Sequence, residues 1–143
     1  ILLLYLKLMV RLLLEKSKDK KLSTHERAED LFKAAILVDT NGKALLDCYY
    51  GYADGRGFFP ELDKEIANRI DRSGMPGEVL NVKYLMYVDY FVANIMWQCA
   101  KMLPDNDVLQ AHALFYGGTL LKRNYDNPHD ADKFYKALVR RNP

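Results

Sequence analysis

The segment that decides the fold is Ala44-Leu-Leu-Asp-Cys-Tyr-Tyr-Gly-Tyr52-Ala-Asp-Gly55-Arg-Gly57-Phe58. It is typical of a helix that ends in a turn with two glycines, because glycine adopts backbone angles that other residues resist. Another helical pattern, Arg27-Ala28-Glu-Asp-Leu31-Phe32-Lys-Ala34-Ala35, precedes it. Small residues let neighbouring helices approach closely, and aromatic residues fill the spaces between them. Both segments therefore favour packed helical hairpins.

Helical periodicity dominates the chain of 143 residues, and strand-like alternation is nearly absent. This length and pattern predict a single all-α domain, 1–143, with about seven helices. The expected architecture is antiparallel helical hairpins stacked as a short α/α superhelix. The predicted helices cover about 1–17, 26–38, 43–53, 60–73, 78–103, 108–122 and 130–141.

Local signals set the expected helix ends. Ser23 or Thr24 is expected to cap the second helix, and Asn41-Gly42 is expected to end it. The segment 104–107, Pro-Asp-Asn-Asp, ends the long helix 78–103. His129 or Asp130 is expected to cap the last helix.

These features resemble the Sel-one-like repeats, relatives of the tetratricopeptide repeats, whose units join two helices by a Gly-x-Gly turn. The matching residues are Ala44, Tyr52, Gly55, Gly57 and Phe58 in one first helix and turn, Ala28, Leu31, Phe32 and Ala35 in a preceding second helix, and Ala113, Gly117 or Gly118, Ala131, Phe134, Tyr135 and Ala137 in a further unit. The chain departs from the family where Cys48-Tyr49 replaces Leu-Gly and Glu65 replaces Ala. The resemblance implies units of roughly 1–40, 41–76 and 108–143, with the long helix 78–103 between the last two.

The first predicted helix is unusually apolar. Ile1 to Leu14 is too short to cross a bilayer, which needs about 20 residues. Its polar residues, Lys7, Arg11, Glu15 and Lys18, are expected to form one thin stripe. Such a helix must be covered by later helices, by a flanking repeat or by a partner. Leu4 and Leu8 are the candidate interface residues, including for homo-oligomerisation.

Tyrosine gives a second indication of function. The chain contains 10 tyrosines, and several of them fall in the third and fifth predicted helices. Their rings could pack the edge of the core, or they could form a binding face, since tyrosine is enriched at interfaces. For a binding face the candidate residues are Tyr50, Tyr87 and Asp89.

Catalytic and metal chemistry find little support in the residues. His25, His112 and His129 are widely separated and lack neighbouring ligands at metal-binding spacing, and no nucleophile–histidine grouping stands out. We therefore expect no enzyme activity, cofactor or metal. Cys48 and Cys99 are expected to be buried thiols in a reducing intracellular compartment, with a disulfide as the alternative.

Composition and architecture together suggest a binding role. Lys and Arg total 21 against 19 Asp and Glu, and a net charge of +2 does not favour nucleic-acid binding. Helical stacks usually bind peptides or protein helices on their concave face. The sequence therefore predicts a protein–protein interaction scaffold or complex subunit. The alternative is a membrane-peripheral protein whose first helix lies on lipid, with Lys7, Arg11 and residues 16–21 toward the headgroups.

Overall fold

The structure is a computed structural model, and it describes residues 2–51, 89, 92–124 and 128–143. Within these ranges it contains five helices and no strand, which confirms the all-α class. They are α1 (Leu2–Lys16), α2 (Thr24–Gly51), a helix at 92–102, α5 (Val108–Asn124) and α6 (Pro128–Arg141). This is fewer than the predicted number, and the predicted helix at 60–73 lies outside the described residues.

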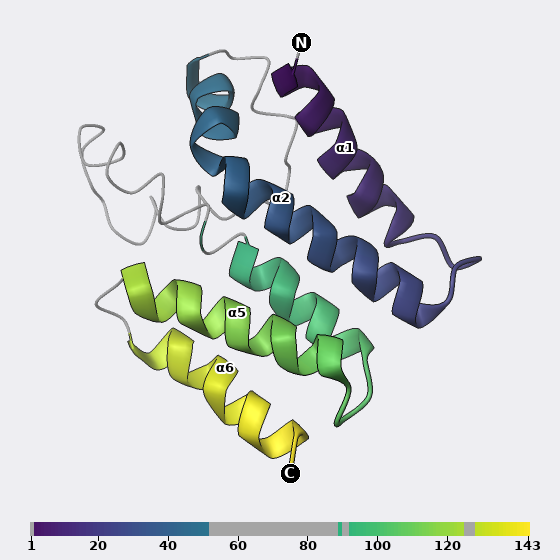
Figure 1. Cartoon of the computed structure of the whole chain (residues 1–143), viewed down its shortest axis with the longest axis vertical. Helices are drawn as coiled ribbons and strands as arrows, with labels where there is room; N and C mark the ends of the chain where they lie inside the picture. The colour runs from purple at the N-terminus through teal and green to yellow at the C-terminus, as the bar shows by residue number, and fades with distance from the viewer. Residues whose placement is uncertain (1, 52–88, 90–91, 125–127) are drawn as a thin grey trace.

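The described helices run alternately up and down (Figure 1). Helices α1 and α2 form one antiparallel hairpin, and α5 and α6 form another. The 92–102 helix lies between them in the chain and next to α2, where the Cys99 thiol donates a hydrogen bond to the Ala28 carbonyl at 3.3 Å. Helix α5 also contacts α2, because the Phe32 ring lies 4.9 Å from the His112 ring and 6.4 Å from the Tyr116 ring.

A continuous hydrophobic core joins all five described helices. Each contributes at least one buried apolar side chain, so α1 and α6 belong to the same packed unit. Its largest fully buried apolar side chains include Val10, Val92, Met96, Leu114 and Leu121, and Phe134 of α6 is the largest buried core residue.

The helix starts follow the predicted capping chemistry at α2. The Ser23 hydroxyl accepts a hydrogen bond from the Glu26 backbone N–H at 3.1 Å, which identifies Ser23 as the cap. Asp107 has the same role at α5, where its carboxylate accepts from the Gln110 N–H at 3.1 Å. Helix α6 begins at Pro128, so His129 and Asp130 lie inside its first turn and do not cap it.

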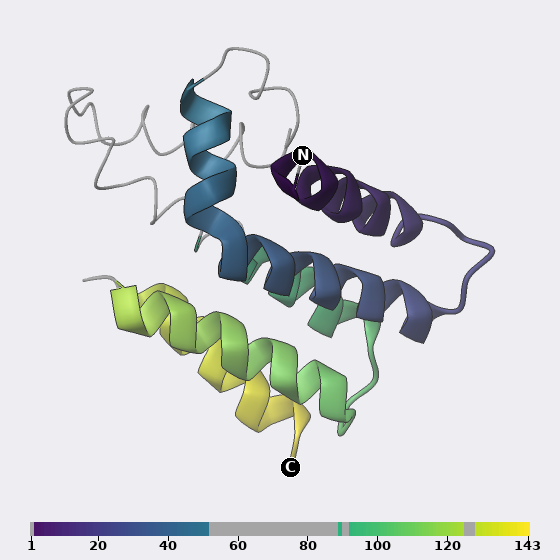
Figure 2. The ribbon, with the colours of Figure 1, turned by 45° about the horizontal axis from the view of Figure 1, so that its top comes forward.

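The predicted stop at Asn41-Gly42 is wrong. Helix α2 continues through both residues to Gly51, so the expected unit boundary between residues 40 and 41 falls inside one helix. The Asn41 side-chain amide donates to the Leu37 carbonyl one turn earlier, at 3.0 Å, and stays within the helix. Figure 2 shows that α2 bends along its length, as helices do where glycine or an inserted side chain disturbs the backbone ladder.

The α5–α6 hairpin is close because α5 carries two glycines at the contact. A Cβ atom on Gly117 would lie 2.5 Å from Cε1 of Phe134, and one on Gly118 would lie 2.9 Å from Cε1 of Tyr135. Phe134 in turn meets the Trp97 ring edge-on, with centroids 5.0 Å apart. The sequence predicted that small residues let helices approach and that Phe134 and Tyr135 fill the spaces between hairpins. In the structure these two rings face glycines within one hairpin, and Phe134 also contacts Trp97.

Candidate functional site

The first candidate is the side of α1 that faces away from α2. Leu4 and Leu8 are 58% and 53% exposed there. We call this surface the outer face of α1. It comprises the exposed residues Leu2, Leu4, Tyr5, Leu8 and Leu12.

The opposite side of α1 packs on α2 through Val10, which is fully buried, and through Leu6, Leu13 and Leu14. Lys7 is only 8% exposed, so the predicted polar stripe is wrong at its first member. Residues four apart on a helix are offset by about 40°, so a stripe with this spacing drifts around the helix. Lys7 therefore falls on the packed side, whereas Arg11 and Glu15 are exposed and pair at 3.4 Å.

The outer face is apolar, yet α1 is short. None of the helices in the described ranges is long and apolar enough to cross a membrane.

The predicted tyrosine face is described only in part. Asp89 is 7% exposed and therefore does not offer its carboxylate to a surface partner in this structure. It lies close enough to Tyr116 to affect the pKa of that phenol. Tyr87 and the side chain of Tyr50 lie outside what the structure describes, so a binding role for these residues stays a prediction.

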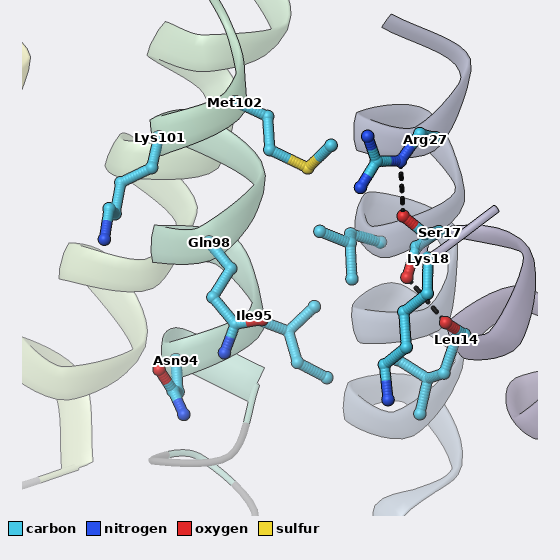
Figure 3. A pocket seen from close by; sticks show the side chains of 10 residues that line it. Leu14, Ser17, Lys18, Arg27, Asn94, Ile95, Gln98, Lys101 and Met102 are labelled. Carbon is cyan, nitrogen blue, oxygen red and sulfur yellow. Dashed lines mark hydrogen bonds between the residues drawn. The ribbon is translucent and has the colours of Figure 1, made fainter. Parts of the chain in front are cut away.

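A second candidate is a cleft of about 430 Å³ where the end of α1 and the first half of α2 face the 92–102 helix. Figure 3 shows its two walls. Ile95 and Met102 point toward α2, while Asn94, Gln98 and Lys101 follow one edge of the 92–102 helix. The facing wall is formed by Leu14, Ser17, Lys18, Arg27 and Leu31.

Arg27 is held in place in this cleft. Its Nε donates to the Ser17 carbonyl at 2.7 Å, and the Ser17 hydroxyl donates to the Leu14 carbonyl at 2.6 Å. In the described part of the chain the two terminal nitrogens of the guanidinium have no hydrogen-bond partner, and Figure 3 places them toward Met102. The cleft therefore presents an oriented cation beside apolar side chains.

A partly buried polar contact between α2 and α5 is the third feature. The Tyr116 hydroxyl donates to the Asp39 carboxylate. Burial raises the pKa of Tyr116 above its ordinary range; the hydrogen bond to Asp39 and the negative charges of Asp39 and Asp89 act in the same direction, and Arg123 opposes them. A phenol that is harder to ionise is not an activated nucleophile, and its hydrogen bond to Asp39 joins α5 to α2.

Cys99 is a buried free thiol, as predicted for this residue, and burial raises its pKa to about 12. The side chain of Cys48 is not among those that the structure describes. The described residues contain no group of three or more His, Cys, Asp or Glu side chains that could hold a metal ion.

Sequence reasoning did not find the cleft. Arg27 lies on α2, whereas Gln98 and Lys101 lie on the 92–102 helix, and no local motif links the two helices. Comparisons with family models, with curated proteins and with solved structures find no match to this chain.

Proposed function

We propose that the chain is a protein–protein interaction module that binds a helix of its partner on the outer face of α1. The supporting observation is the exposure of Leu4 and Leu8 on a helix whose other side packs on α2. Five large apolar side chains, each more than half exposed, form a patch on the order of 500 Å². Patches of this size often mark protein or membrane contacts.

The occupant to test first is a second copy of the chain. A two-fold axis would bring the same patch of both copies together, and this patch carries no charged side chain that would repel itself. The exposed charges nearest to it, Arg11 and Glu15, neutralise each other. Charge repulsion therefore does not oppose self-association.

A binding role also agrees with the cleft. The described residues that line it include no carboxylate, histidine or thiol, and its one serine, Ser17, donates its hydroxyl to the Leu14 carbonyl. No histidine in this lining could therefore activate Ser17 as a nucleophile, and we propose a binding role for the cleft.

The close α5–α6 hairpin supports a further proposal about architecture. Glycines that face Phe134 and Tyr135 match the pattern of the Sel-one-like repeats. We propose that α5 and α6 are a degenerate unit of this kind, and that successive hairpins stack as a short superhelix.

Light scattering over a concentration series tests self-association. We expect the wild-type chain to dimerise, and Leu4→Glu or Leu8→Glu to weaken the dimer at least about tenfold, because each would bury an unpaired charge. Val139→Glu is the matched control, since Val139 is 74% exposed but lies on α6. Circular dichroism checks that all three variants keep their helices.

Two outcomes would contradict the proposal. A wild-type chain that stays monomeric at every concentration would exclude the second copy as occupant. Sedimentation with phosphatidylglycerol vesicles that Leu4→Glu abolishes, and Val139→Glu does not, would assign the outer face to a membrane surface.

A further inference from the structure

We infer that the cleft between α2 and the 92–102 helix binds a small amphipathic carboxylate, an anionic head group on a short apolar chain. The inference concerns a different surface from the outer face of α1 and does not depend on the function proposed above. A volume of about 430 Å³ is within the range of small-molecule sites. The cleft also combines apolar walls with a few polar groups, as such sites do.

The apolar part of the ligand would lie against the side chains that face each other across the cleft. Ile95 and Met102 project from one wall, and Leu14 and Leu31 belong to the other. Ile95 and Leu31 are buried core residues, so the apolar surface of the cleft is continuous with the hydrophobic core. An alkyl chain in contact with them would be removed from water on both sides.

The head group would be recognised by Arg27. Its Nε bond to the Ser17 carbonyl fixes the guanidinium, and the two terminal nitrogens remain to donate to an anion. Fixing the donor in advance lowers the entropy lost on binding.

The charges around the cleft favour an anion and disfavour a cation. Arg27 and Lys101 bring positive charge to the cleft, whereas its described lining includes no carboxylate. Asp30, which is on α2 near Arg27, is buried and lies 4.0 Å from the Lys16 ammonium, so a cation already accompanies it. Asn94 and Gln98 add polar side chains along the opposite edge of the cleft.

An NMR titration with octanoate, with octanol as the uncharged probe, tests the inference. We expect octanoate to shift the side-chain amide signals of Asn94 and Gln98, and octanol to bind at least about tenfold more weakly. Loss of the charge-assisted bond to Arg27 is the reason for the difference. If octanol binds as tightly as octanoate, or neither moves these amides, the inference is wrong.

Gln98 permits a charge series at one exposed position. Gln98→Glu should weaken octanoate binding about tenfold and Gln98→Lys should strengthen it, whereas either change should affect the uncharged octanol less. Lys101→Gln should also weaken octanoate binding. Lys33→Gln is the matched control, because Lys33 is an exposed lysine of α2 that does not line the cleft. Equal octanoate affinities in Gln98→Glu and Gln98→Lys would place the ligand elsewhere.

Vesicles that contain a long-chain fatty acid separate a soluble carboxylate from one presented by a bilayer. We expect the protein to bind soluble octanoate. We do not expect its cleft to attach it to these vesicles, so the cleft should not cause it to sediment with them. Sedimentation that Gln98→Glu abolishes would contradict a soluble ligand.

Discussion

Arg141 shows how much a single side chain can hold together. Its Nε donates to the Asp105 carboxylate at 2.8 Å, and its terminal nitrogens donate to the carbonyls of Ala100, at 2.7 Å, and of Leu103. These two carbonyls lie at the end of the 92–102 helix, where the last carbonyls lack the usual partner four residues later, although the Ala100 carbonyl also accepts from the Leu103 N–H at 3.2 Å. Arg141 therefore joins the end of α6 to the end of the 92–102 helix.

We predict that Arg141→Gln lowers the free energy of unfolding by about 2 kcal/mol, because buried carbonyls lose a charged donor. The neighbouring Arg140 is exposed, and Arg140→Gln should change this free energy by less than about 0.5 kcal/mol. Urea denaturation of the three proteins measures the difference. Equal effects of the two substitutions would show that the contacts of Arg141 add nothing to stability.

At the scale of elements, the α5–α6 contact makes a prediction that opposes helix propensity. Alanine favours a helix over glycine by up to about 1 kcal/mol, so Gly117→Ala would stabilise an isolated α5. Its Cβ would instead lie 2.5 Å from Cε1 of Phe134, a buried ring held against Trp97. Overpacking of this kind costs about 1–3 kcal/mol, so we expect a net loss of stability.

Thermal unfolding of Gly117→Ala tests this balance, with Lys122→Ala on the exposed side of α5 as the control. We expect the control to unfold near the wild-type temperature and Gly117→Ala to unfold several degrees lower, about 2–8 °C. A Gly117→Ala protein that is more stable than wild type would mean that Phe134 moves aside at little cost.

The elements also show what the sequence could predict. The extent of α1, the cap at Ser23 and the helix end before Pro104 agree with expectation, because caps and prolines act through nearby backbone groups. The helix end predicted at Asn41-Gly42 was wrong, because the preference of these residues for ending a helix is worth only about 1 kcal/mol. Asn41 donates its side-chain amide to the Leu37 carbonyl within the helix, so this residue is accommodated there without ending α2.

For the molecule as a whole, the sites depended on contacts that no local pattern contains. The sequence predicted an apolar first helix and selected Leu4 and Leu8, but not which side of α1 would pack on α2. The cleft needed α2 and the 92–102 helix to be brought together, and this came from the shared core. Periodicity predicts that a helix has an apolar face, whereas the pairing of faces is decided by the complete set of helices.

We expect the stability of the whole molecule to fall at alkaline pH, because the shared core buries an ionisable thiol. Burial raises the pKa of the Cys99 thiol from 9.0 to about 12, and the negative charge of Asp107 acts in the same direction. Above pH 9 the unfolded chain ionises this thiol while the folded chain keeps it neutral, so ionisation favours unfolding. The contribution is therefore fully present below about pH 9 and is lost as the pH rises toward 12.

We expect the unfolding free energy to fall by up to about 1.4 kcal/mol per pH unit from this thiol alone. Tyr116, whose pKa is also raised by burial and by Asp39, adds to the fall at higher pH. Urea denaturation between pH 8 and 11, in steps of about half a unit, should give a shallower slope for Cys99→Ala than for wild type, whatever their difference at pH 8. Tyr116→Phe, measured over the same pH range, gives the contribution of the Tyr116 phenol to the fall in unfolding free energy. If the unfolding free energies of Cys99→Ala and wild type fall with the same slope against pH, ionisation of this thiol does not contribute to unfolding. The alkaline sensitivity then comes from other groups.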